Sequence, residues 1–275
     1  MDWASIDRGV GEPILLLHGQ PGSGSAWLPL VGLLAPEFRV LAPDRVGYGA
    51  TPGEAVGLAE NAELAARHLV DAGAGPATVV AHSWAGGVGV LLAHRYPHLV
   101  RSLVLVGAAC TPDSLTTLDF WLNLPVVGGA LTVLGLFGIS EVLPVARLLT
   151  RSVPAPLDDW LRAALPDYGV MGNARGAIGR PKRSFMIEQR ALTDEMATIT
   201  RTLASLDLPV EVVAGDWDLV VPPTAALSLV RAIPDAELTL VPRAGHFLAR
   251  DAPEQLAAII ERAVRAVGEP DSAAG

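Results

Sequence analysis

Six short runs of Val, Ile, Leu and Ala recur along the chain, and they constrain the fold more than any other feature. None shows strict polar alternation, so each is typical of a strand buried on both faces. Stretches of helical length separate the runs. This alternation predicts an α/β fold with a doubly wound, mostly parallel sheet. The runs are Ile14–Leu17, Arg39–Ala42, Thr78–Ala81, Leu103–Val106, Val210–Ala214 and Leu238–Val241.

The segments between these runs predict helices that cover the sheet. Asp251 is expected to be the N-cap of the last helix, with Pro253 in its first turn. The predicted helices are Ala26–Leu34, Ala59–Ala72, Trp84–Tyr96, Thr224–Ala232 and Pro253–Val267.

The alternation stops between residues 111 and 200, which contain apolar helical segments broken by prolines and no strand signal. A structureless loop of this length is rare in a compact domain. We therefore expect a helical cap or lid at 111–200, inserted into a core made of residues 1–110 and 201–268. Residues 269–275 are expected to form a disordered tail.

The composition excludes some classes of function. A net charge of −9 disfavours nucleic-acid binding, which needs clustered Lys and Arg. The single cysteine, Cys110, cannot form an internal disulfide, so nothing points to an oxidising compartment. Phe120–Ser140 lacks charge and is nominally long enough to span a bilayer, but Pro125 and several glycines favour a lid or buried helix pair. With no signal peptide at the N-terminus, we expect a cytoplasmic protein without stable membrane insertion.

A serine occupies the predicted tight turn between a strand and the next helix, in Ala81-His82-Ser83-Trp84-Ala85. Such a turn exposes the serine hydroxyl above the sheet, and small residues two positions to either side let strand and helix approach closely. The common motif has glycine at both flanks, whereas this chain has alanine. Ser83 is therefore a candidate nucleophile, and the alternative is a serine that caps the helix.

A carboxylate and a histidine follow two later strands. The candidate base is His246, in Gly245-His246-Phe247, because a histidine can take the serine's proton and return it to the leaving group. Asp216 and Asp218 compete for the acid that orients this histidine, and Asp113 is a third candidate. The order serine, aspartate, histidine is the one found in α/β-hydrolases.

The loop after the first predicted strand supplies a further element, His18-Gly19-Gln20-Pro21-Gly22. Acyl transfer needs two N–H groups that stabilise the developing oxyanion. We expect one from Trp84, which follows the nucleophile. The other is expected from Gln20, because Pro21 has no N–H.

These motifs together resemble the α/β-hydrolase superfamily from Ile6 to about Val267. The resemblance implies a sheet of eight strands with an antiparallel start, a cap after Leu103–Val106, and Asp218 rather than Asp216 as the acid. Because only Trp3–Ile6 precedes Ile14, we expect the first strand to be missing. The motifs are His18-Gly19-Gln20-Pro21-Gly22, Asp44-Arg45-Val46-Gly47-Tyr48-Gly49, His82-Ser83-Trp84-Ala85-Gly86-Gly87, Gly215-Asp216-Trp217-Asp218 and Gly245-His246-Phe247.

The resemblance leaves several reactions open. His82-Ser83-Trp84 is similar to the haloalkane dehalogenase and epoxide hydrolase branch, but serine replaces the aspartate of that branch, so those activities do not carry over. We expect a carboxylesterase-like enzyme that acts on a small to medium apolar substrate. The alternatives are a cofactor-free C–C bond hydrolase, an acyl transferase, a proline iminopeptidase-like peptidase, and a ligand-binding member with little turnover. Gln20 departs from the iminopeptidase pattern His-Gly-Gly-Pro-Gly.

The predicted cap suggests what the substrate contacts. Its charge-free segment Phe120–Phe137 is expected to roof an apolar pocket, or only to pack the cap onto the core. No metal or organic cofactor is expected, because the histidines near the site lie in separate loops without ligand spacing. A basic cluster either meets a substrate carboxylate or lies in a solvated loop: Arg175, Arg180, Lys182 and Arg183. The expected pocket residues are Trp27, Phe120, Trp121, Leu219 and Phe247.

Overall fold

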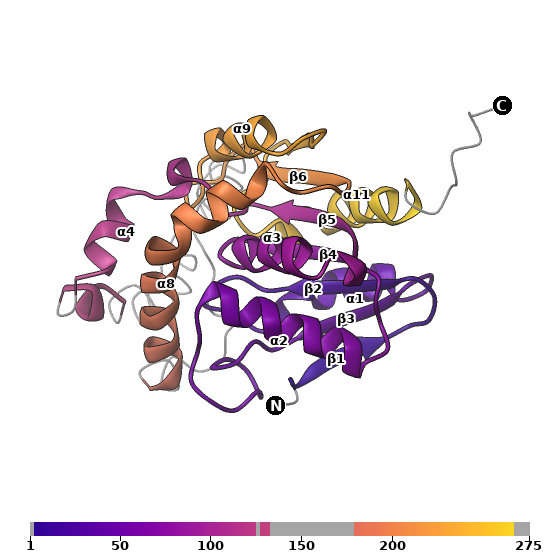
Figure 1. Ribbon diagram of the computed structural model, residues 1–275, viewed down its shortest axis with the longest axis horizontal. Helices are drawn as coiled ribbons and strands as arrows, with labels where there is room; N and C mark the ends of the chain where they lie inside the picture. Colours follow the sequence, from indigo (N-terminus) through magenta and orange to yellow (C-terminus); the bar gives the residue numbers. More distant parts are fainter. Residues whose placement is uncertain (1–2, 125–126, 133–178, 267–275) are drawn as a thin grey trace, which may run out of the picture.

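The computed structural model describes residues 3–124, 127–132 and 179–266. In these residues seven strands form one sheet, in the order β1-β3-β2-β4-β5-β6-β7 (Figure 1). β1 runs antiparallel to β3, and every other neighbouring pair is parallel. The strands are β1 (Ser5–Arg8), β2 (Pro13–Leu17), β3 (Arg39–Pro43), β4 (Ala77–His82), β5 (Val100–Val106), β6 (Val210–Gly215) and β7 (Glu237–Val241).

All six apolar runs are strands, which confirms the doubly wound α/β fold. The expectation that the first strand is missing is wrong, because an antiparallel strand, β1, is present at the start of the chain. The described residues form seven strands, whereas the resemblance implies eight. β1 lies at the edge of the sheet, with Ser5 opposite Pro43 and Arg8 opposite Val40. Its side chains are mostly exposed, so it carries no buried apolar run by which the sequence could reveal it.

Helices cover both faces of the sheet (Figure 1). Alternate side chains of each central strand enter two separate apolar cores: Leu15 and Leu17 face one, and Ile14 and Leu16 face the other. The first core is covered by α2 (Leu58–Asp71), α3 (Ala85–Arg95) and α9 (Pro223–Ala232), and the second by α1 (Leu28–Leu34) and α11 (Pro253–Ala266). Short helices are η1 (Gly24–Trp27), η2 (Pro97–Leu99), η3 (Pro112–Ser114) and α10 (Leu248–Asp251).

The prediction that Asp251 caps α11 is wrong. Asp251 is the last residue of α10, a short helix that ends just before α11 begins at Pro253. Its carboxylate instead accepts a hydrogen bond from the backbone N–H of Gly245, at 3.1 Å. Asp251 therefore supports the loop that carries His246.

In the described part of the segment expected to form the cap, α4 (Thr117–Leu122) and α8 (Arg180–Leu203) lie beyond the ends of the parallel strands (Figure 1). Leu192, Met196 and Ile199 bury one side of α8 in the first core. Residues 125–126 and 133–178 lie outside the described residues, and so do Arg175, part of the apolar segment Phe120–Ser140 and the tail 269–275. Within the described residues, no helix is long and apolar enough to cross a membrane.

Candidate active site

Ser83 lies in the turn between β4 and α3, with a left-handed backbone at φ 57°. This conformation is rare for a residue other than glycine and indicates local strain. Three backbone hydrogen bonds hold it: the Ser83 N–H donates to Val106 O at 2.9 Å, and the Ser83 carbonyl accepts from Gly86 and Ala109 at 2.9 and 3.1 Å. The sequence predicts that small residues beside Ser83 let strand and helix approach closely. Gly86 is one such residue, because a Cβ there would lie 2.5 Å from that of Ala108.

His246 joins Ser83 to Asp218. Its Nε2 lies 2.9 Å from Ser83 Oγ, and its Nδ1 lies 2.8 Å from Asp218 Oδ2. The other carboxylate oxygen of Asp218 accepts the N–H groups of Val220 and Val221, at 2.8 and 2.9 Å. The side chains of His246 and Asp218 are 5% and 0% exposed, so water does not compete for these bonds. This is the arrangement of nucleophile, base and orienting acid used in acyl transfer.

Neither of the other candidate acids meets His246. Asp216 is exposed, and its Oδ1 accepts the backbone N–H of Arg243 at 2.6 Å. Asp113 lies in η3, where its carboxylate accepts the hydroxyl of Ser228. Of the three candidate carboxylates, Asp218 is thus the one that contacts His246, as the resemblance implies, and its role as the acid stays a prediction.

Gly107, which lies in none of the sequence motifs, lets the loops of Asp218 and His246 meet. Gly107 follows β5 with φ +50°, and a Cβ there would lie 3.2 Å from Asp218 Oδ2 and 3.3 Å from His246 Nδ1. Those contacts are tighter than ordinary van der Waals packing. A side chain at this position would therefore press on the hydrogen bond between His246 and Asp218.

The loop after β2 lies against the serine. A Cβ added to Gly19 would be only 2.8 Å from Ser83 Cβ. Within the described residues, the backbone N–H groups of Gln20 and Trp84 donate to no protein acceptor. Both groups are thus available beside Ser83, as an oxyanion hole requires, and their role stays a prediction.

Two further histidines near the site are neutral. Burial lowers the pKa of His82 to about 3, with a smaller contribution from neighbouring His246, and His82 Nε2 donates to the His246 carbonyl at 2.9 Å. Burial and then the charge of Arg45 hold the pKa of His18 well below its usual range. Among the described residues, no group of three His, Cys, Asp or Glu side chains is placed to hold a metal ion.

The expected pocket residues divide into two groups. Trp27 and Phe247 lie against the histidines: the Trp27 ring is 6.1 Å from that of His82, and the Phe247 ring is 5.3 Å from that of His246. The other three side chains are exposed, at 62% for Phe120, 46% for Trp121 and 60% for Leu219. Their contact with a substrate stays a prediction.

A series of hydrogen bonds between amide and carboxylate side chains joins α4 to the loop after β2, and no sequence motif indicates it. Gln20 Nε2 donates to Gln189 Oε1 at 2.7 Å, and Gln189 Nε2 donates to Asp119 Oδ1 at 2.7 Å. Asp119 also closes a capping box with Thr116 at the start of α4. The position of the loop that carries Gln20 is therefore tied to both α4 and α8.

One residue of the predicted basic cluster, Arg180, makes hydrogen bonds within the fold. Arg180 donates to the backbone carbonyls of Thr51 and Gly49, the first at 3.0 Å. It thus anchors the start of α8 on the loop after β3.

The chain is similar in sequence to a known family and to several curated proteins. The family described as "alpha/beta hydrolase fold" matches residues 12–253. A protein of Mycobacterium tuberculosis, Rv2715, is 29% identical over 265 residues, which cover 92% of this chain and 75% of that protein. An Escherichia coli O6:H1 protein named "Putative carbamate hydrolase RutD" is 28% identical over 252 residues, covering 90% of this chain and 86% of that one.

Solved structures agree at lower identity. A thermophilic esterase from Thermogutta terrifontis matches with a TM-score of 0.71 at 23% identity, over 97% of this chain and 94% of that chain. The haloalkane dehalogenase DbeA from Bradyrhizobium elkani matches with a TM-score of 0.76 at 21% identity, over 96% and 94%. Identities this low indicate the fold and not the reaction. Since the family match spans nearly the whole described core, the chain belongs to the α/β-hydrolase fold family.

Proposed function

We propose that this chain is a serine hydrolase that cleaves an ester or a related acyl bond of a small to medium apolar substrate through an acyl-Ser83 intermediate. The observation that carries the proposal is the buried hydrogen-bonded chain from Ser83 through His246 to Asp218. It lies on a strained turn at the end of β4, where open α/β sheets place their sites.

Ser83, His246 and Asp218 each have one task in this mechanism. As Ser83 Oγ attacks the acyl carbon, its proton passes to His246 Nε2. Asp218 keeps the proton of the neutral ring on Nδ1 and stabilises the imidazolium that forms. His246 then gives its new proton to the departing alkoxide. In the second half, His246 activates a water molecule that attacks the acyl carbon and releases Ser83.

The oxyanion formed in each half carries charge that Ser83 cannot neutralise. The N–H groups of Gln20 and Trp84 are proposed to donate to it. Loss of one such donor typically costs about 3 kcal/mol of transition-state stabilisation.

A relative of this chain supports acyl chemistry among the reactions open to this fold. It is 28% identical and is named for carbamate hydrolysis. A carbamate presents an acyl carbon bonded to a heteroatom, as the mechanism at Ser83 requires. In the haloalkane dehalogenase branch, which the sequence around Ser83 resembles, the nucleophile is an aspartate carboxylate. This chain has a serine at that position.

The test is steady-state turnover of p-nitrophenyl acetate and butyrate by the wild type and by Ser83→Ala. We expect turnover in the wild type and a loss of about 10⁴-fold or more in the variant. The control is Ser205→Ala, which removes an exposed serine whose hydroxyl lies 3.0 Å from His94 Nδ1 and which should keep wild-type rates.

A panel of esters, amides and β-diketones separates the remaining alternatives. Cleavage of β-diketones in preference to esters would support a C–C bond hydrolase. Preference for amides would support a peptidase. Tight binding without turnover of any compound would support a ligand-binding protein and refute the proposal.

A further inference from the structure

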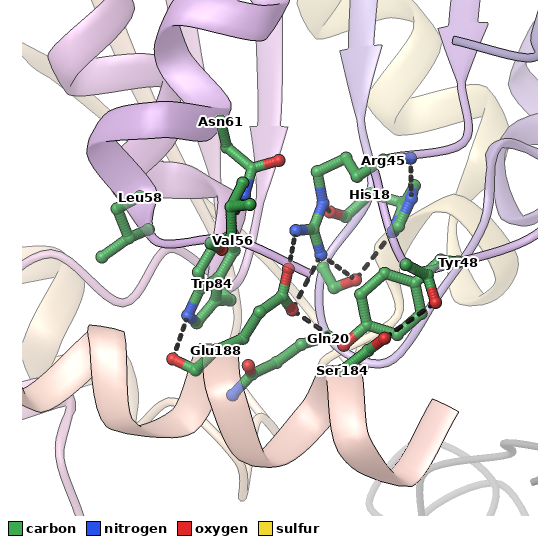
Figure 2. Close-up of polar contacts among 12 residues, drawn as sticks. His18, Gln20, Arg45, Tyr48, Val56, Leu58, Asn61, Trp84, Ser184 and Glu188 are labelled. Atoms are coloured by element: carbon green, nitrogen blue, oxygen red, sulfur yellow. Dashed lines mark hydrogen bonds and ion pairs between the residues drawn. The ribbon is translucent and has the colours of Figure 1, made fainter. Parts of the chain in front are cut away.

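Glu188, a buried residue of α8, contacts Trp84, which carries one proposed oxyanion donor, and Arg45, which contacts the loop that carries the other (Figure 2). Its backbone carbonyl accepts the indole N–H of Trp84 at 2.8 Å. Its carboxylate binds the guanidinium of Arg45 through both oxygens and accepts the hydroxyl of Tyr48 at 2.9 Å. The side chains of Arg45 and Glu188 are both 0% exposed. Glu188 therefore contacts one donor residue, Trp84, directly, and it holds the Arg45 side chain that lies against the loop of the other.

Arg45 extends this contact to the loop after β2. Its Nε donates to His18 O and its Nη2 to Gly19 O, both at 3.0 Å. Its backbone N–H donates to His18 Nε2 at 3.0 Å, so the proton of the neutral His18 ring lies on Nδ1. That Nδ1–H donates to Gly19 O at 2.8 Å. The Gly19 carbonyl is therefore held by two donors.

The direction of the Gly19 carbonyl decides where the Gln20 N–H points. The Gly19–Gln20 peptide bond is trans, so its C=O and N–H point in opposite directions. With the carbonyl fixed on Arg45 and His18, the N–H is directed away from them and stays free of protein acceptors in the described residues. A cation on the carbonyl also polarises the peptide and strengthens its N–H as a donor.

The second donor depends on the same pair. The Arg45 guanidinium lies over the Trp84 ring, 4.5 Å from its centroid, in a cation–π contact. The indole is thus held on its face by Arg45 and at its N–H by Glu188. Trp84 directly follows the strained Ser83, so contacts that restrain its side chain also restrain the turn that carries its backbone N–H.

On the basis of the proposed function, we propose that Arg45 and Glu188 are positioning residues that hold both oxyanion donors, so that the hole forms only when α8 is docked. Neither side chain needs to touch the substrate. A purely structural role is a poor explanation for this pair, because a buried ion pair can often be replaced by apolar residues without loss of stability. Arginine is required here because one side chain must bind two carbonyls and a carboxylate together.

The test removes the pair without leaving a buried charge. In the double variant R45M/E188M, we expect a folded protein with an unchanged or higher unfolding temperature. We expect kcat for p-nitrophenyl butyrate to fall about 100-fold while KM changes less than about threefold. The affinity for a trifluoromethyl ketone, which forms an oxyanion on Ser83, should fall in parallel. Matched control Ser184→Ala removes only the hydrogen bond from α8 to Gly47 O, at 2.8 Å, and should keep kcat.

A folded double variant with wild-type kcat and ketone affinity would overturn the proposal. If the double variant does not fold, Arg45→Lys keeps the charge opposite Glu188 but cannot hold both carbonyls, and wild-type kcat in that variant would overturn the proposal equally. Wild-type protein that neither turns over esters nor reacts at Ser83 would refute the proposed function instead. The positioning role is then decided by amide hydrogen exchange: faster exchange in residues 18–22 of the variant, with residues 58–71 unchanged, supports it, and unchanged exchange in residues 18–22 refutes it.

Discussion

Replacing Asp218 by asparagine removes the acid and changes little else in shape. In the wild type, Asp218 Oδ2 accepts from His246 Nδ1 at 2.8 Å, and Oδ1 accepts from Val220 and Val221. Asparagine has one oxygen and one NH₂ group. If its oxygen stays on the two backbone N–H groups, its NH₂ faces His246, and Nδ1 must become the acceptor. The ring proton then lies on Nε2, which can no longer take the proton of Ser83.

The expected effect on turnover is large and specific. The wrong tautomer should lower kcat by about 10⁴, equivalent to about 5.5 kcal/mol of transition-state stabilisation. Asp216→Asn is the matched control, because an amide oxygen can still accept the Arg243 N–H at this exposed turn. We expect that variant to keep kcat within about threefold.

The assay is kcat for p-nitrophenyl butyrate, with thermal unfolding of each variant followed by circular dichroism to show that it is folded. Near-wild-type turnover in a folded Asp218→Asn protein would refute the reasoning. Loss of turnover in Asp216→Asn alone would move the acid to Asp216.

Two further substitutions test the surroundings of the serine. Gly19→Ala places a Cβ 2.8 Å from Ser83 Cβ. We therefore expect kcat to fall at least about tenfold and the free energy of unfolding to fall by about 1–3 kcal/mol. Wild-type kinetics would show that this loop is not packed on the serine. The pKa of His82 falls from 6.5 in the unfolded chain to about 3 in the folded protein, which therefore binds fewer protons than the unfolded chain between these pH values. The folded protein accordingly loses stability as the pH falls through this window, by up to about 1.4 kcal/mol per pH unit. His82→Gln should make the free energy of unfolding, measured by urea titration at about pH 7 and about pH 5, less dependent on pH; the same dependence in both proteins would contradict the assignment.

The strands, and the meeting of Ser83, Asp218 and His246, could be predicted because their signals are local. A buried parallel strand needs an apolar run, and Ser83 directly follows β4, while Asp218 and His246 lie in the loops that follow β6 and β7. Strand ends that share one edge of a sheet bring these loops together whatever the helices do. The choice between Asp216 and Asp218 could not be made locally, because it depends on which carboxylate reaches His246 in space.

The positioning network around the site could not be predicted from the sequence. Arg45 and Glu188 are 143 residues apart, and a charged residue in an amphipathic helix is almost always solvated. Gln189 and Asp119 are joined only because α4 and α8 both dock at the ends of the strands. Pairings of this kind depend on how helices pack, which periodicity does not specify.

The central claim is that Ser83 is an activated nucleophile, and labelling by a fluorophosphonate tests it most directly. The reagent phosphonylates a serine only when a base activates it and an oxyanion site stabilises the adduct. We expect intact-mass spectrometry to show one adduct, mapped by peptide analysis to Ser83 and absent from Ser83→Ala. The exposed Ser205, whose hydroxyl also contacts a histidine, should stay unlabelled. A folded wild-type protein without an adduct at Ser83 would contradict the account.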